Sequence, residues 1–156
     1  MLNFKIIMVP TDFSDRSLRA LPYAVSLAER YGARLKIVYV HQPSLRVSDV
    51  AWVGVNDRTT SGEHMDTARR RLEKIVLDQI PREVPVDAEL LTGDPVDCVV
   101  EYARDNGVEL IVMATHGRGG ISHVLMGSVA EHIVRKAPCP VLTLKQPMSV
   151  TAAANE

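Results

Sequence analysis

The amino-acid sequence predicts an α/β fold in which an open five-stranded parallel sheet, of Rossmann-like type, carries helices on both faces. Two observations predict it: short apolar runs recur along the chain, and segments with helical periodicity separate them. A nearly continuous apolar run is typical of a strand buried on both faces, and strand–helix alternation favours parallel connections. The expected strands cover residues 4–9, 35–40, 86–91, 110–113 and 141–144.

The first helix is expected between the first two strands. Apolar residues recur there at the three- and four-residue steps of one helical face. They are Leu18, Leu21, Val25 and Ala28. Gly32 is expected to end this helix. Pro22 has no backbone N–H, so we expect a late start or a slight bend near it.

A long loop and a second helix follow the second strand. Residues 42–62 have no steady period, and a stretch of this length is usually functional or disordered. It carries Trp52, and two interpretations stay open: a loop that closes over a ligand, and a mobile surface loop. The helix is expected from Glu63, and Pro81 closes it.

The last two helices have clear signals at their ends. Asp94 is expected to cap a helix that Pro95 begins and Gly107 ends. The final helix is expected over residues 127–137. Its inward residues are expected to be Val129, Ala130, Ile133 and Val134.

Composition favours one globular domain without a nucleic-acid or membrane partner. The chain has 156 residues, 46% of them apolar, and a net charge of -1. Such a charge attracts neither nucleic acid nor an anionic membrane, and an aromatic share of 4% argues against a base-stacking platform. Residues 1–9 lack the features of a signal peptide, so we expect a cytoplasmic protein. Cys98 and Cys139 are expected to be reduced structural thiols.

Polar residues follow the first and fourth expected strands. Pro10, Thr11 and Asp12 come directly after the first, and residues 114–117 (Ala-Thr-His-Gly) follow the fourth. If these strands are neighbours where the strand order reverses, both segments reach the ligand site of an open sheet. Asp12 could accept hydrogen bonds from an adenine amino group or a ribose hydroxyl, or bind Mg²⁺. The other interpretation is that the acidic and serine residues here only cap the first helix.

Glycines near the fourth strand indicate a phosphate site. Gly127 and Ser128 come ten residues after Gly117, at the expected start of the last helix. Glycine lets main-chain amides approach phosphate closely, and a helix N-terminus favours anions. A segment that only turns the chain is the alternative. The sequence has no G-x-x-x-x-G-K-[ST], and Ser122 interrupts a G-x-G-x-x-G, so P-loop and dinucleotide folds are disfavoured.

Three segments carry a resemblance to a known family. They are IIMVPTDFSD after the first strand, GDPVD, and ELIVMATHGRGGISHVLMGSVAEHIVRKAPCPVLTL. Over residues 4–144 the chain resembles the universal stress protein family, whose fold is adenine nucleotide alpha hydrolase-like. We expect one domain over residues 1–147 and a loose tail over 148–156, and the resemblance implies a homodimer.

The family has a branch that binds ATP and a branch that binds no nucleotide. The binding branch is marked by G-x-x-G, nine residues, and G-[ST]. Here Gly117, Gly127 and Ser128 match this pattern, while Ala114 occupies the first glycine position. The alanine would weaken binding if the backbone needed a positive φ there.

The resemblance also implies roles for individual residues. Pro10, Thr11 and Asp12 would bound the adenine and the ribose. Val40 would present backbone groups to the base, and Met113 would pack near it. The phosphate contacts would be Gly117, Gly127, Ser128 and Val129, with Ala114 and His116 in the same segment. We add Arg118 as a candidate phosphate partner; a solvated arginine is the alternative.

The expected function is a nucleotide-dependent stress-response or regulatory module. It would bind ATP, or ADP or AMP, with Mg²⁺ for which Asp12 is a candidate ligand, and its regulated protein partner is unknown. No catalytic residues are expected, and at most slow ATP hydrolysis. Two alternatives stay open: a family member that works through protein–protein contacts alone, and an ATP-hydrolysing or adenylating enzyme.

A response-regulator receiver is disfavoured. It would use Thr115 and Lys145 after the fourth and fifth strands, but a receiver ends with a full helix that this chain lacks. Its phosphate acceptor would have to be Asp94, which is better explained as a helix cap.

Three further features are the histidines, a run of arginines and the edge of the last strand. His116, His123 and His132 lack the spacing of metal ligands. The Arg69–Arg71 run is expected to be solvated, opposite the apolar face of its helix. The last strand has no element after it, and an uncovered apolar edge favours pairing with a second copy.

Overall fold

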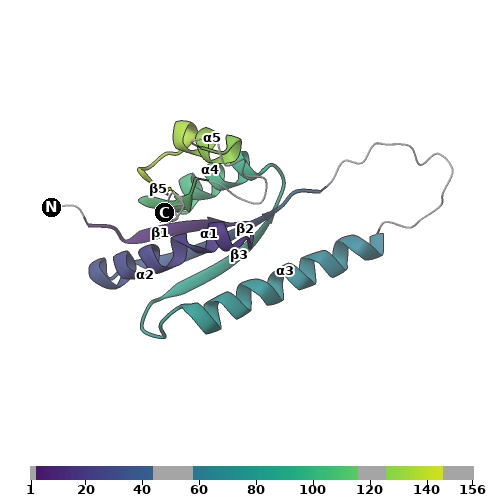
Figure 1. Cartoon of the computed structure of the whole chain (residues 1–156), viewed down its shortest axis with the longest axis horizontal. Helices are drawn as coiled ribbons and strands as arrows, with labels where there is room; N and C mark the ends of the chain where they lie inside the picture. The colour runs from purple at the N-terminus through teal and green to yellow at the C-terminus, as the bar shows by residue number, and fades with distance from the viewer. Residues whose placement is uncertain (1–2, 44–57, 116–125, 146–156) are drawn as a thin grey trace, which may run out of the picture.

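The computed structural model describes residues 3–43, 58–115 and 126–145, in which strands alternate with helices and two helices lie between the first two strands (Figure 1). In chain order they are β1 (Ile6–Thr11), α1 (Asp15–Leu18), α2 (Ala20–Tyr31), β2 (Arg34–His41), α3 (Arg58–Gln79), β3 (Val86–Thr92), α4 (Pro95–Asp105), β4 (Leu110–Ala114), α5 (Ser128–Lys136) and β5 (Val141–Leu144).

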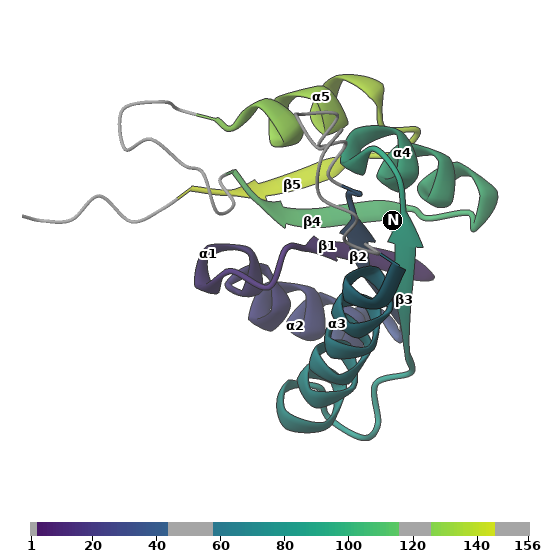
Figure 2. The same cartoon turned by 90° about the vertical axis from the view of Figure 1, so that its right-hand side faces the viewer.

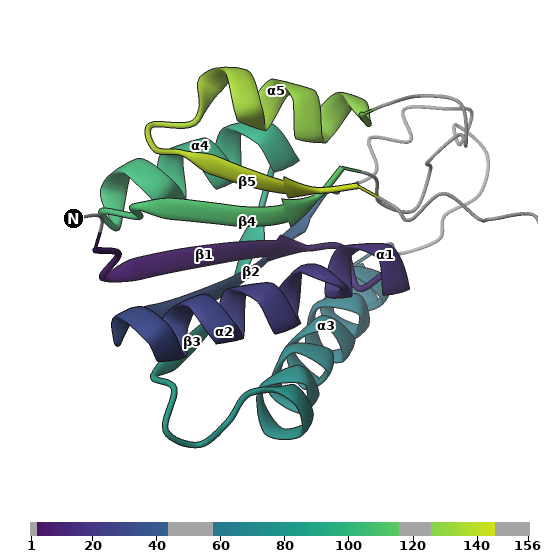
Figure 3. The ribbon, with the colours of Figure 1, turned by 60° about the vertical axis from the view of Figure 1, so that its left-hand side comes forward.

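The five strands make one parallel sheet in the order β3-β2-β1-β4-β5. Helices α1, α2 and α3 lie on one face of the sheet, and α4 and α5 lie on the other (Figures 2 and 3). The chain runs outward from β1 to β3 on one side, then crosses back to β4 and β5. The predicted fold class is therefore confirmed, and β1 and β4 are neighbours at the reversal point.

The sheet opens at the carboxyl ends of β1 and β4. Strand β1 pairs with β2 along its whole length, from Ile6 to Thr11. Its register with β4, within these described strands, covers Ile7 and Met8 alone. Pro10 has no N–H to donate, so it cannot extend a ladder on both sides of the strand. The strand also runs two residues beyond the predicted end at Val9.

The predicted bend in the first helix is a break into two helices. Arg19 separates α1 from α2, three residues before Pro22. The missing N–H of Pro22 leaves the carbonyl of Leu18, four residues earlier, without its helical partner. Gly32 ends α2 in the left-handed region, with φ of 63°, as predicted.

Helix α3 begins at Arg58, five residues before the predicted start at Glu63, so residues 58–62 are helix and not loop. Threonine, serine and glycine are weak helix formers, which favoured a loop from sequence alone. Once a long helix exists, each added residue gains a hydrogen bond at low cost, and the helix extends through them. Residues 44–57, which include Trp52, lie outside the described residues.

Each face of the sheet has its own apolar core. Ile7, Val9 and Ile37 pack against α2 and α3, while Met8 and Val38 pack against α4 and α5. Ala130 and Ile133 of α5 are buried as predicted, but Val129 and Val134 are each 42% exposed. They were expected to face inward because an apolar residue in an amphipathic helix usually does. The short helix α5 contacts the sheet along a narrow stripe, which excludes them.

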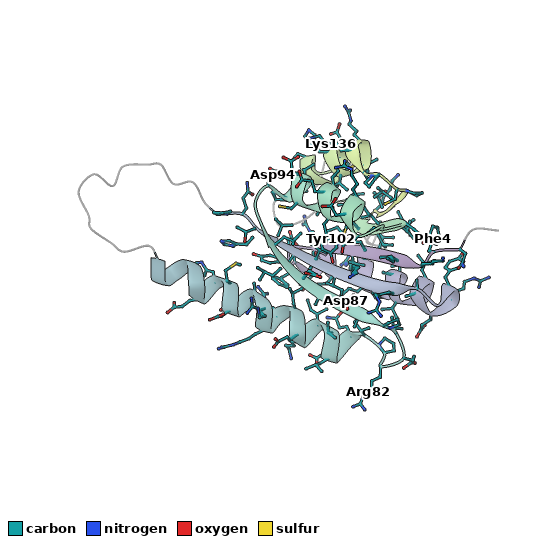
Figure 4. All side chains as sticks on the ribbon, turned by 180° about the vertical axis from the view of Figure 1, so that it is seen from behind. Phe4, Arg82, Asp87, Asp94, Tyr102 and Lys136 are labelled. Atoms are coloured by element: carbon teal, nitrogen blue, oxygen red, sulfur yellow. The ribbon has the colours of Figure 1, made fainter. Side chains whose placement is uncertain are left out.

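Helix α4 has the predicted cap, and both cysteines are free thiols. Asp94 lies at the beginning of α4 (Figure 4), and its Oδ1 accepts hydrogen bonds from the amides of Val96 and Asp97. Cys98 and Cys139 form no disulfide, and burial raises the pKa of both thiols. In the part of the chain that the structure describes, no helix is long and apolar enough to cross a membrane.

Candidate functional site

A cavity of 820 Å³ lies at the carboxyl ends of β1, β2 and β4. The sheet order places this edge at the reversal point, where open α/β sheets bind their ligands. Helix α3 contributes to one wall, and α4 and α5 contribute to the opposite one. The volume is within the range of small-molecule sites.

The structure brings together all the described residues that the sequence placed at the site. Those lining the cavity are Pro10, Thr11, Asp12, Val40, Met113, Ala114, Gly127, Ser128 and Val129. They come from four separate segments of the chain. The remaining candidates, His116, Gly117 and Arg118, lie outside the described residues.

The α4 and α5 wall of the cavity is apolar. Its side chains include Val38, Val40, Val99, Met113 and Ile133, which belong to the core cluster on that face of the sheet. A flat, weakly polar group such as a purine would bury its faces here without leaving a charge unpaired.

The first turn of α5 is the most polar feature on this wall. Its N-cap is Gly127, which has no side chain to accept hydrogen bonds from the amides that follow. Ser128, Val129 and Ala130 supply those first-turn amides and line the cavity. Amides at a helix N-terminus lack intrahelical acceptors and, together with the helix dipole, attract anions.

Gly127 itself acts differently from the sequence-based expectation. Its N–H donates to the carbonyl of Thr115 at 2.7 Å, so this amide is not left bare for a phosphate. Its φ of -69° is open to any residue. Gly127 therefore leaves the N-terminus of α5 uncovered by a side chain. The amides of Ser128, Val129 and Ala130 remain available to bind an anion.

The turn after β1 is braced by buried hydroxyl groups. Thr11 Oγ1 lies 2.9 Å from Ser17 Oγ and accepts a hydrogen bond from the amide of Phe13 at 3.0 Å. Ser17 Oγ donates to the carbonyl of Ser14, which uses its one proton. Thr11 must then be the donor to Ser17. Its hydroxyl has no proton left for a ligand, so its contribution to the site is to hold the turn.

Asp12 lines the cavity but also shapes the turn. Its Oδ1 accepts hydrogen bonds from the amide and the hydroxyl of Ser14, and Ser14 in turn caps α1. The ligand and capping interpretations of this segment are therefore compatible, because Ser14 is the N-cap and Asp12 lies two residues before it. Among the described residues no group of three metal-ligating side chains is present.

The sequence did not indicate the contribution of α3. His64, Thr67, Ala68 and Arg71 line the cavity, together with Phe13, Tyr39 and His41. Arg71 is exposed, as expected, but it does not lie opposite the apolar face, because its guanidinium is 4.8 Å from the centroid of the Phe13 ring. The spacing of Arg71 from Ala68 could have signalled this, since residues three apart share a helical face.

Ala114 occupies a backbone conformation that suits an alanine. Among the described residues, Phe13 is the one non-glycine residue with a positive φ. Ala114 ends β4 and pairs with Leu144 of β5. The replacement of glycine by alanine at this position therefore costs no backbone strain.

Comparison with known proteins identifies the family. The model of the universal stress protein family matches residues 3–145, which is nearly the whole chain. The chain belongs to the universal stress protein family. Relatives in the family include universal stress protein MJ0531 of Methanocaldococcus jannaschii, which is 33% identical over 92% of this chain and 84% of its own length. A universal stress protein of Thermus aquaticus is also 33% identical, over 91% and 99%.

Solved universal stress protein structures have the same architecture. The structure of MJ0577 has a TM-score of 0.80 at 25% identity and covers 95% of this chain and 100% of its own. A family member from Archaeoglobus fulgidus, solved in complex with dAMP, has a TM-score of 0.57 at 23% identity and covers 92% and 98%. A universal stress protein in complex with cAMP has a TM-score of 0.61 at 24% identity and covers 94% and 100%.

Proposed function

We propose that this universal stress protein binds an adenine nucleotide, ATP or its products ADP and AMP, in the cavity at the carboxyl edge of the sheet. One observation carries the proposal: the uncapped first turn of α5 opens into a large cavity whose adjoining wall is apolar. This pairing of an anion-binding end with an apolar compartment suits a phosphorylated purine.

The base and ribose would lie between the ends of β1, β2 and β4. Pro10 and Met113 would contact the faces of the adenine, and the backbone of Val40 would meet its edge, where β2 ends. Asp12 would accept a hydrogen bond from the ribose or the adenine amino group. The phosphates would then extend to the amides of Ser128 and Val129.

Two family structures support adenine nucleotides as the ligand class. The Archaeoglobus fulgidus protein holds dAMP, and another universal stress protein holds cAMP. Their likeness to this chain is one of fold, so the residues above, and not the likeness, carry the assignment. If Mg²⁺ accompanies ATP, Asp12 and the phosphates themselves would be its ligands.

We further propose that the protein works as a cytoplasmic regulatory module and forms a homodimer. Strand β5 is at the edge of the described sheet, and Leu142 on it is 39% exposed. An exposed edge strand with apolar side chains favours pairing with a second copy. Nucleotide binding would alter contacts with a regulated protein, with ATP hydrolysis slow at most.

Gly127→Val tests the nucleotide site. We expect the wild-type protein to bind ATP with Mg²⁺ at about micromolar affinity, which corresponds to about 8 kcal/mol. Valine at this position should abolish detectable binding, because its side chain would cover the first-turn amides of α5. The fold should persist, since φ at Gly127 is -69°. Isothermal titration calorimetry measures both affinities.

Gly62→Val is the matched control. Gly62 lies in α3, away from the cavity lining, and a Cβ there would meet no atom within 4 Å. Its affinity for ATP should equal that of the wild type. Equal affinities in all three proteins would show that ATP, if bound, does not use the N-terminus of α5.

A further inference from the structure

The cavity extends onto the second face of the sheet. Successive residues of a strand point to opposite faces. Val38 and Val40 accordingly belong to the core cluster against α4 and α5, whereas Tyr39 packs with Phe13 in the cluster against α2 and α3. Both sets line the same 820 Å³ space. It therefore has an α3 side that the nucleotide contacts named above do not use.

The α3 side is lined by one face of that helix. His64, Thr67, Ala68 and Arg71 are spaced by three and four residues, as on one helical face, and all four line the cavity. His41, at the end of β2, adds a second imidazole. Ala68 is buried and fixes this face of α3 against the core.

The guanidinium of Arg71, an exposed side chain, lies over the ring of Phe13. The guanidinium is 4.8 Å from the centroid of Phe13, which stacks on Tyr39 with centroids 4.4 Å apart and an interplanar angle of 27°. Phe13 is buried and has a φ of 65°, an uncommon conformation for a bulky residue. Strained backbone of this kind clusters at functional sites. A contact with a ring uses none of the five N–H donors of an arginine.

The charges on this side favour an anion. Within the described ranges, no carboxylate forms an ion pair with Arg71, and Asp12 is the one carboxylate that lines the cavity. Arg71 brings a permanent positive charge, and His41 and His64 bring ring N–H groups. The hydroxyl of Thr67 adds a further donor.

We propose that the α3 side of the cavity is a second, anion-binding subsite that takes a phosphate group, free or carried by a small molecule, with Arg71 as its main contact. A guanidinium matches phosphate with two parallel hydrogen bonds, and a tetrahedral anion has acceptors enough for several donors. This subsite is separate from the α5 terminus, because its residues come from α3 and the opposite face of β2. It does not rest on nucleotide binding.

Inorganic phosphate is the probe, followed by the side-chain Nε–Hε signals of arginine in ¹⁵N NMR spectra. Phosphate should shift the Arg71 signal of the wild-type protein. Arg71→Gln keeps a good helix former but lacks this signal, so its phosphate affinity is measured by isothermal titration calorimetry. It should be about tenfold or more weaker than that of the wild type, as expected for loss of a charged hydrogen-bond donor. The matched control is Arg70→Gln, because Arg70 is exposed on the same helix and outside the cavity lining. The phosphate affinity of Arg70→Gln should stay within about twofold of the wild-type value.

Gly127→Val separates this proposal from the nucleotide site. The variant should lose ATP binding and keep the Arg71 response to phosphate. The subsite is contradicted if phosphate leaves the Arg71 signal unmoved, if Arg71→Gln and Arg70→Gln have equal affinities, or if Gly127→Val alone removes phosphate binding. A circular dichroism spectrum confirms that each variant is folded.

Discussion

Two hydroxyl groups determine the shape of the turn between β1 and α1. The proton of Ser17 goes to the carbonyl of Ser14, and the proton of Thr11 goes to Ser17. Thr11 also accepts the amide hydrogen bond of Phe13, the residue with the positive φ. The hydroxyl of Thr11 thus provides a hydrogen-bond acceptor for the buried amide of Phe13, which would otherwise be unpaired.

Thr11→Val tests this role. Valine has the same shape without the hydroxyl, so the amide of Phe13 and the hydroxyl of Ser17 each lose a partner in a buried position. We expect the free energy of unfolding to fall by about 1–3 kcal/mol, the range for an unsatisfied buried polar group. Urea denaturation followed by circular dichroism measures the loss.

Thr92→Val provides the comparison, because Thr92 is exposed at the end of β3. The free energy of unfolding of Thr92→Val should stay within about 0.5 kcal/mol of the wild-type value. A Thr11→Val protein as stable as Thr92→Val would mean that the hydroxyl network does not hold the turn.

At the scale of single residues, the sequence predicted which residues lie at the site. It predicted less well what role each of them has. Pro10, Thr11 and Asp12 follow a buried strand, which is enough to place them at the sheet edge. Whether Thr11 contacts a ligand or its own turn depends on Ser17, six residues away, and on where its one proton goes. No periodicity carries that information.

At the scale of elements, two helix N-termini show opposite chemistry. The N-cap of α4 is Asp94, whose carboxylate accepts hydrogen bonds from the amides of Val96 and Asp97. The N-cap of α5 is Gly127, which has no side chain to accept them. Since a carboxylate cap already satisfies the amides and the dipole of α4, an external anion has a site at α5 alone of these two.

At the same scale, the free edge of β5 can pair with a second copy of the chain. The carbonyls of Pro140 and Leu144 accept hydrogen bonds from the amides of Ile111 in β4 and of Thr115, the residue after β4. In a parallel ladder the alternate residues point their N–H and C=O groups to the other side, so Thr143 presents its N–H at the open edge. This group is available to a second copy of the chain.

Thr143→Pro should therefore disrupt the homodimer and leave the sheet intact, because proline is tolerated where the lost N–H faces outward. In sedimentation velocity, the wild type should run at twice the 17.2 kDa of one chain, and the variant as a monomer. A wild type that remains monomeric at micromolar concentration would contradict pairing through β5.

Element order could be predicted from the sequence, while some boundaries could not. The strands are apolar runs between glycine, proline and aspartate signals, so their positions follow from local chemistry. The start of α3 at Arg58 does not, because helix extension through residues 58–62 depends on the rest of a long helix. The outward position of Val134 depends on how little of α5 the sheet covers.

At the scale of the whole molecule, the sheet order creates the cavity. The strand order reverses between β1 and β4. In the described strands their ladder is confined to Ile7 and Met8, so the two strands leave room at their carboxyl ends. The part of the lining at the strand ends and at the start of α5 could be predicted, since a parallel sheet brings all its strand ends to one edge. The part from α3 could not, because it requires knowing which face of the sheet α3 covers and how far the helix extends past it.

The central claim is that the first-turn amides of α5 hold the phosphates of an adenine nucleotide. The most direct measurement is a ¹H–¹⁵N correlation spectrum of the wild-type protein titrated with ATP and Mg²⁺. The amides of Ser128, Val129 and Ala130 should shift and saturate together, while Val96 and Asp97, which Asp94 already caps, should remain unmoved. ATP binding that leaves the α5 amides unshifted would contradict the claim.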